Sequence, residues 1–259
     1  MLKKLFRILR ALFAFCLIFF ALAPFCYVIF WSFFQNGGVF SLEYYLRVFV
    51  YQSQFLLRFW QSLGMCLCIA AGQLLVSVLA GYGFAKYPYR GSGVIFFLLM
   101  ILMVMPVQVT LVPNYLLLGH IGLLNSYAGL VLPMVFAPLG AFILRQSFRS
   151  VPDAVLDAAK LDGCGVIKTL ACVAMPMNIN GLVCTALLSF LDAWNMVEQP
   201  ITYLNHFENY PLSVALAYVP PADSGIQFAC CVLVILPPLF LFNCFNKELV
   251  EGIVLAEVK

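Results

Sequence analysis

The sequence predicts an all-α membrane protein with six transmembrane helices and with both termini in the cytoplasm. Three observations lead to this prediction. Of the 259 residues, 64% are hydrophobic and only 10% are charged, whereas a soluble domain carries about 25% charged residues. Several apolar stretches reach the roughly 20 residues that a helix needs to cross a bilayer. The basic residues gather on one side of the resulting topology.

The apolar stretches are read as helices because every backbone polar group in the hydrocarbon core must bond within the protein, and these runs are too long and continuous for barrel strands. In the first stretch an Ala-Leu-Ala triplet imitates a cleavage site, but Pro24 follows it and the apolar run continues to Phe34. We therefore expect a retained helix rather than a signal peptide. The six predicted spans cover residues 11–34, 59–84, 94–116, 127–144, 177–198 and 225–244.

Lysines and arginines predict the orientation of the chain. If the N-terminus is cytoplasmic, the outside segments hold only Arg47 and Arg58, and every other basic residue lies inside. This asymmetry follows the positive-inside rule. The net charge of +3 is too small to indicate a nucleic-acid partner. The inside residues are Lys3, Lys4, Arg7, Arg10, Lys86, Arg90, Arg145, Arg149, Lys160, Lys168, Lys247 and Lys259.

The connections between the spans contain no signature of nucleotide or metal chemistry. The sequence has no GxxxxGK[ST] motif, so nucleotide binding through a P-loop is excluded. Cysteines and histidines show no zinc spacing, and we expect no catalytic residue and no metal site in this chain. The outside segment 199–224 contains several prolines and is expected to be an irregular, solvent-facing loop.

A polar stretch, residues 150–176, separates the fourth span from the fifth. Pro152 is suited to the first turn of a short helix, where its missing N–H has no partner in any case. Asp153 then lies at the positive end of the helix dipole. Gly163 is expected to end this helix in a left-handed conformation. A second short helix is expected from Val166 to Met175.

The first of these short helices is expected to carry a narrow stripe of apolar residues, Ala154, Ala158 and Leu161, at helical spacing. Asp157 and Lys160 are spaced to pair on its exposed side. A helix of about ten residues is marginal alone in water, so the stripe fits docking into a groove on a partner protein. An amphipathic connector resting on lipid headgroups explains the same pattern equally well.

The stretch DAAKLDGCGVIKTLACVAMP, residues 157–176, resembles the EAA loop of bacterial ABC importer permeases, whose pattern is E-A-A, then D-G-A, then I-x-L-P. Aspartate replaces glutamate at 157, cysteine replaces alanine at 164 and methionine replaces leucine at 175. By this resemblance the residues that contact the ATPase are Asp157, Ala158, Ala159, Asp162, Gly163 and Pro176, the last of which is expected to open the fifth span.

The resemblance covers nearly the whole chain. Residues 106–133 and 142–159 are similar to the second permease of carbohydrate importers of the maltose type, as is the ending FNKELVEGIVLAEVK. The Trp-Asn pair at 194–195 and Pro200 match that group's W-N-D…P stretch, with Met196 in place of the acid. The resemblance implies the type I ABC importer permease fold, with an N-terminal part at 1–58, a permease core at 59–246 and a cytoplasmic tail at 247–259.

The resemblance also implies a heteromeric importer in a bacterial cytoplasmic membrane. Its other parts are a second permease, two ATP-binding subunits and an extracytoplasmic solute-binding protein. This chain then needs no cofactor of its own, because ATP and Mg²⁺ are held by the partner ATPase, and it is not itself an enzyme. An oligosaccharide is the favoured solute, while a monosaccharide or a polyol phosphate also fits. An ATP-independent secondary transporter or channel is the alternative function.

Polar residues at membrane depth are candidates for the solute path, because such groups are costly there and usually face a cavity or the bundle interior. Pro106 and Pro113 are expected to bend the third span and to free backbone carbonyls. Packing is the competing role: Trp194 as an interfacial anchor and Asn195 as a bond to a neighbouring helix. The candidate path residues are Gln108, Asn114, Asp192, Trp194 and Asn195.

Overall fold

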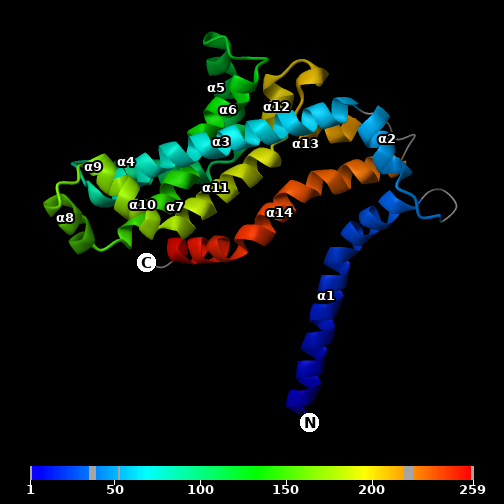
Figure 1. Ribbon diagram of the computed structural model, residues 1–259, viewed down its shortest axis with the longest axis horizontal. Helices are drawn as coiled ribbons and strands as arrows, with labels where there is room; N and C mark the ends of the chain where they lie inside the picture. The colour runs from blue at the N-terminus through cyan, green and yellow to red at the C-terminus, as the bar shows by residue number, and fades with distance from the viewer. Residues whose placement is uncertain (1, 35–38, 52, 219–223, 258–259) are drawn as a thin grey trace. The chain divides into compact units, whose positions relative to one another are not determined.

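The computed structural model describes residues 2–34, 39–51, 53–218 and 224–257. Within these ranges the regular elements are all helical, and the only β pairing is an isolated bridge between Phe34 and Phe40. The predicted all-α class is therefore confirmed (Figure 1).

The chain divides into two compact units. The first joins Met1–Leu57 to Leu216–Pro237, and the second joins Arg58–Ala215 to Pro238–Lys259. The division into an N-terminal part, a permease core and a tail remains a prediction. Of the predicted tail, residues 247–257 belong to the last helix, and residues 258–259 lie outside the described residues.

The first unit contains α1 (Leu2–Phe33), α2 (Glu43–Tyr51) and the first part of α14 (Ser224–Glu257). Helix α14 begins directly against α2, since a Cβ added at Gly225 would overlap the ring of Tyr44. Glycine permits this close approach, and it fixes the start of α14 on the buried face of α2.

The second unit contains α3 from Arg58 onward, the helices that follow it as far as α13, and the end of α14 (Figure 1). Helices α8, α9 and α10 lie together at one end of the unit, and α5, α6 and α12 lie together elsewhere in it. The elements are α3 (Ser53–Lys86), α4 (Ser92–Val104), α5 (Val107–His120), α6 (Tyr127–Val135), α7 (Pro138–Arg149), α8 (Asp153–Leu161), α9 (Val166–Thr169), the π-helical turn η1 (Leu170–Ala174), α10 (Met175–Met177), α11 (Ile179–Trp194), α12 (Glu198–Tyr203), η2 (Phe207–Asn209) and α13 (Leu212–Ala215).

Among the described residues, four helical segments are long and apolar enough to cross a membrane, and two sharply bent helix pairs raise the number to six if each pair is one span. The chain therefore has four to six candidate spans. The four are Leu12–Phe33, Gln54–Lys86, Tyr127–Arg149 and Ser224–Gly252. The bent pairs are Ser92–Val104 with Val107–His120 and Val166–Met177 with Ile179–Trp194.

The third span predicted over residues 94–116 is sharply bent, since α4 and α5 meet at 104°. The break falls at Met105, whose ψ of 132° is extended. A residue before proline is pushed out of the α region, so Pro106 causes the bend, as expected. Pro113, the second proline expected to bend this span, lies inside α5, and the helix continues through it.

The fifth span does not open at Pro176 as predicted, since that residue lies in α10. The chain turns by 86° at Asn178, which has φ −123° and ψ 33°. The Asn178 side chain accepts a hydrogen bond from Ser147 Oγ at 2.9 Å and donates one to the Ala174 carbonyl at 2.9 Å. Asparagine side chains that bond backbone groups compete with the helix in this way, so a buried polar contact sets the bend.

The segment 199–224 is not the irregular, solvent-facing loop that was predicted. It contains α12, η2 and α13, and Tyr203, Leu204 and Leu212 are buried. The Leu212 amide donates to Ser62 Oγ on α3 at 2.8 Å. Pro211 separates η2 from α13, whereas Pro200 lies inside α12, and residues 219–223 lie outside the described ones.

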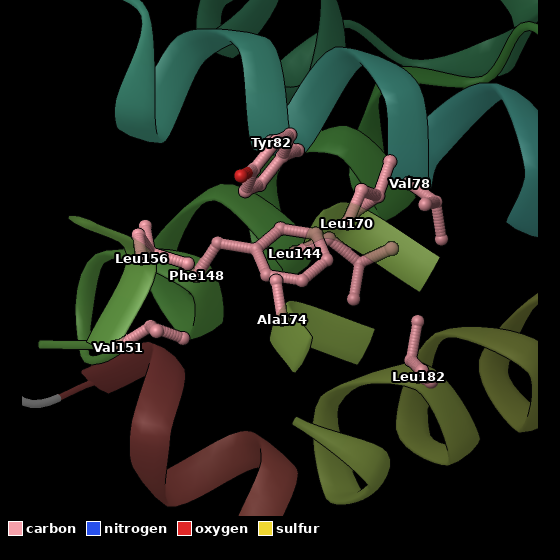
Figure 2. Close-up of a cluster of buried hydrophobic side chains, with 9 residues drawn as sticks. All are labelled: Val78, Tyr82, Leu144, Phe148, Val151, Leu156, Leu170, Ala174 and Leu182. Atoms are coloured by element: carbon pink, nitrogen blue, oxygen red, sulfur yellow. The ribbon is translucent and has the colours of Figure 1, made fainter. Parts of the chain in front are cut away.

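A cluster of buried apolar side chains ties the end of α3 to α7, α8, η1 and α11 (Figure 2). At its centre the rings of Tyr82 and Phe148 meet edge to face, with centroids 5.5 Å apart. The cluster, called the basal cluster below, consists of Val78, Tyr82, Leu144, Phe148, Val151, Leu156, Leu170, Ala174 and Leu182.

Candidate functional site

The predicted short helix of the polar stretch is present as α8. It begins after Pro152 and ends before Gly163, the two residues expected to set its ends. Pro152 precedes it with an extended ψ of 133°. Gly163 follows with φ +78°. The Gly163 amide donates to the Lys160 carbonyl and the Cys164 amide to the Ala159 carbonyl, each at 3.0 Å. These paired bonds form a Schellman motif, so the predicted left-handed stop at Gly163 is confirmed.

The second short helix is confirmed in extent but not in type. It runs from Val166 through α9, η1 and α10, and its middle, Leu170–Ala174, is a π-helical turn. Such turns are rare and often occur at functional positions. Thr169, the last residue before this turn, has a buried Oγ1 with no hydrogen-bond partner among the residues that the structure describes.

Helix α8 has two apolar faces, and they have different surroundings. Leu156 is 4% exposed and belongs to the basal cluster, with Ala159 buried on the same side. The predicted stripe lies on the outer face: Ala154 and Ala158 are exposed, and Leu161 is 90% exposed. The inner face holds α8 on the protein, and the outer face remains available for a partner.

The residues assigned to ATPase contact are mostly on this outer side. Asp157, Ala158, Asp162 and Gly163 are exposed on α8 or its C-terminal cap. Asp157 accepts a hydrogen bond from Lys160 Nζ at 2.8 Å, as its spacing predicted. The other two assigned residues are placed differently, since Ala159 is buried and Pro176 is exposed on α10.

Opposite charges meet around the base of α8. A cavity of about 510 Å³ is bounded by the end of α3, the turn after it, α7 and α8. The hydrogen bond and charge of Lys86 lower the pKa of Asp153, and those of Asp157 raise the pKa of Lys160. The lining residues are Ala85, Lys86, Tyr87, Pro88, Arg149, Asp153, Leu156, Asp157 and Lys160.

Lys86 and Asn178 are the polar residues of this region that the sequence did not single out. Lys86 Nζ donates to the Val151 carbonyl at 2.6 Å and to Asp153 Oδ1 at 2.7 Å. The local signals were a cation at a helix end and an asparagine two residues after a proline, and neither signal identifies a partner far away in sequence.

Two of the candidate path residues connect α5 to α12. Gln108 Nε2 donates to Glu198 Oε1 at 2.6 Å, while the other carboxylate oxygen of Glu198 is buried and has no partner within the described part of the chain. Asn114 forms a side-chain hydrogen bond with Tyr203. The burial of Tyr203 raises its pKa, and this hydrogen bond partly opposes the rise. The path role of both candidates remains a prediction.

The other path candidates lie at the end of α11. Trp194 is 5% exposed, stacked on Phe190 with centroids 5.6 Å apart and edge-on to Phe59 at 5.9 Å. Asn195 is exposed and its Nδ2 donates to the Leu191 carbonyl at 2.8 Å, while Asp192 is exposed on α11. The enclosed ring of Trp194 favours the packing role for that residue.

A polytopic all-helical chain that presents a capped polar helix between two of its candidate spans has the features of a membrane permease. The family comparison agrees with this class. Residues 73–253 match the model of the binding-protein-dependent transport system inner membrane component family. This match covers well over half of the 259 residues, and the chain belongs to that family.

Relatives with assigned roles match most of the chain. The arabinooligosaccharides transport system permease protein AraQ of Bacillus subtilis is 29% identical over 224 residues, covering 85% of this chain and 80% of AraQ. AraQ of Halalkalibacterium halodurans is 27% identical, with the same coverage of both chains. The sn-glycerol-3-phosphate transport system permease protein UgpE of Yersinia pestis is 26% identical, covering 76% of this chain and 72% of UgpE.

A solved structure shares the fold. A chain of a bacterial ABC transporter involved in the import of the acidic polysaccharide alginate superposes with a TM-score of 0.84 at 21% identity, covering 95% of this chain and 96% of that one. This agreement over nearly the full length supports the helical arrangement described above.

Proposed function

We propose that this chain is a permease subunit of an ATP-driven ABC importer in a bacterial cytoplasmic membrane. It forms half of the translocation path for a carbohydrate that an extracytoplasmic binding protein delivers. A second permease forms the other half, and two ATP-binding subunits hold the ATP and Mg²⁺. Membership of the binding-protein-dependent family supports the importer class, and the carbohydrate follows from the named roles of its relatives.

The observation that carries the coupling part of the proposal is the outer face of α8. A nine-residue helix is too short to be stable alone, and the basal cluster buries only its inner side. Leu161, the most exposed of its apolar residues, lies one turn from the acidic Asp157 and next to the Gly163 cap. We assign this exposed face to an ATPase subunit, with Asp157, Ala158, Asp162 and Gly163 at the contact.

An oligosaccharide is the proposed solute. Both AraQ relatives are named for arabinooligosaccharide transport and are slightly more similar to this chain than UgpE is. A polyol phosphate is the second candidate because UgpE is named for sn-glycerol 3-phosphate. For either solute, Gln108 and Asn114 on α5 and Asp192 on α11 are proposed hydrogen-bonding groups of the path.

Transport by the purified assembly tests the proposal. The chain is co-purified with its second permease and ATPase, reconstituted into proteoliposomes with ATP on the ATPase side, and supplied with its binding protein. We expect uptake of labelled arabinotriose that requires both ATP and the binding protein. If the assembly takes up sn-glycerol 3-phosphate and no arabinotriose, the proposed solute is wrong and the proposed importer function stands.

The alternative function gives the opposite result in the same vesicles. If an imposed proton or sodium gradient drives uptake by this chain without ATP, the ATP-independent secondary transporter replaces the importer. A non-hydrolysable ATP analogue serves as the control, since it binds the ATPase and supports no turnover.

A further inference from the structure

Lys86 joins the end of the longest described helix of the second unit to the start of α8. It is the last residue of α3, a helix of 34 residues. Its ammonium donates to the Val151 carbonyl at 2.6 Å and to Asp153 Oδ1 at 2.7 Å. Charge-assisted hydrogen bonds of this length are the stronger kind, so the end of α3 is tied to both the backbone before α8 and the first residue of α8.

The burial of Lys86 makes this contact specific. Its side chain is only 9% exposed, whereas that of Asp153 is 81% exposed. An exposed ion pair contributes little by itself, but a lysine that has lost most of its water needs its acceptors. The burial of Lys86 therefore makes both of its acceptors, the Val151 carbonyl and the Asp153 carboxylate, necessary to the contact.

A cavity lies where Lys86 meets the N-terminal part of α8. It is the cavity of about 510 Å³ described above, and its lining includes Lys86, Asp153, Leu156 and Asp157. The apolar contact of Leu156 with the basal cluster holds α8 down, but apolar burial is non-directional. Two directed hydrogen bonds across the edge of a cavity fix the direction in which the helix points.

We propose that Lys86 is a positioning residue for energy coupling: its bonds to Val151 and Asp153 hold α8 at the angle at which its outer face meets the ATPase. This inference rests on the proposed importer function. Lys86 acts through α8 and does not itself touch nucleotide or solute. Without these bonds, α8 remains attached through Leu156 but its orientation is no longer fixed. A smaller share of the ATPase's hydrolysis events then leads to solute transport.

The test uses the assembled importer with a photo-reactive p-benzoylphenylalanine in place of Leu161, on the outer face of α8. We expect light to cross-link this position to the ATPase. Lys86→Met is expected to lower the cross-linking yield at least fivefold. It is also expected to raise the ATP hydrolysed per arabinotriose imported at least threefold, in complexes that assemble in normal amounts. Lys86→Arg keeps the charge and the donors and is expected to stay within twofold of the unmodified importer.

Arg90→Met is the matched control, because it removes an exposed cation from the turn that follows Lys86 and leaves the hydrogen bonds of Lys86 to Val151 and Asp153 intact. We expect it to change neither readout. Normal cross-linking and a normal ATP-to-arabinotriose ratio in Lys86→Met would overturn the positioning role alone. If Lys86→Met does not assemble, Asp153→Ala replaces it, because alanine offers no side-chain acceptor and removes one of the two bonds. An Asp153→Ala importer that matches the unmodified one in both readouts overturns the positioning role equally.

Failure of the underlying function has a different signature. If position 161 of the unmodified assembly cross-links to no ATP-hydrolysing subunit, the coupling part of the proposed function is wrong and the role of Lys86 falls with it. Cross-linking that is present in the unmodified assembly and lost in Lys86→Met supports both.

Discussion

Replacement of Gly163 by arginine is expected to abolish ATP-driven uptake and to leave the folded permease in the membrane. Gly163 has φ +78°, and a Cβ added there meets nothing within 4 Å. The cost inside the chain is therefore backbone strain alone, about 1–2 kcal/mol for a residue with a side chain in the left-handed region. For a chain of this size that corresponds to a fall in Tm of roughly 2–8 °C.

The strain does not grow with the side chain, because the space around Gly163 is open within this chain. Gly163→Ala and Gly163→Arg are therefore expected to show the same thermal stability. In uptake they should differ, since only arginine extends far across the face assigned to the ATPase. Of the three variants, Gly163→Asn is expected to have the highest thermal stability, because asparagine tolerates the left-handed conformation.

Gly91 provides a matched control for this series. Its φ is +88°, and an added Cβ there also meets nothing within 4 Å, but it precedes α4 rather than capping α8. Gly91→Arg carries the same strain and charge and is expected to retain uptake. The assays are resistance to alkaline extraction for membrane insertion, thermal melting for stability and ATP-dependent arabinotriose uptake for coupling. Full uptake by Gly163→Arg would refute the docking role of the α8 cap.

Further perturbations test the packing and charge of the second unit. Leu156→Ala should destabilise the permease by roughly 2–5 kcal/mol, the usual range for a buried leucine, whereas Leu161→Ala on the exposed face should leave the melting temperature of the isolated permease unchanged. Gly140→Ala should lower the yield of folded protein in detergent, because its Cβ would overlap a serine side chain of α3. The lowered pKa of Asp153 means that its contact with Lys86 stabilises the fold above the ordinary aspartate pKa of about 3.9 and weakens only as pH falls through the lower folded value. The melting difference between the unmodified protein and Asp153→Asn should therefore stay constant from about pH 5 to 8.

The parts of the structure that the sequence predicted well are those set by local chemistry. The apolar helices follow from run length, the bend at Pro106 follows from the restriction on the residue before proline, and the stop at Gly163 follows from the freedom of glycine. The pairing of Asp157 with Lys160 likewise needs only helical spacing. In each case the cause lies within a few residues of the effect.

The parts that sequence reasoning missed depend on partners far along the chain. Asn178, rather than Pro176, sets the bend before α11 because its amide reaches Ser147, which lies on α7. Lys86 reaches Asp153 across 67 positions of sequence. A single sequence contains no signal for such pairs, since many other polar residues offer the same hydrogen-bonding groups.

The two faces of α8 connect the fold to the proposed mechanism. Sequence spacing identified the outer stripe, and the basal cluster shows how the inner face is buried: Leu156 lies beside Phe148 in a cluster that also contains Tyr82 from α3 and Leu182 from α11 (Figure 2). A close-packed interior transmits displacement rather than absorbing it. We therefore expect a displacement of α8 by a partner on its outer face to reach α3 and α11 together. A lipid-resting connector offers no such partner, because headgroups exert no directed force on a helix, and the burial of Leu156 against several helices would then serve stability alone.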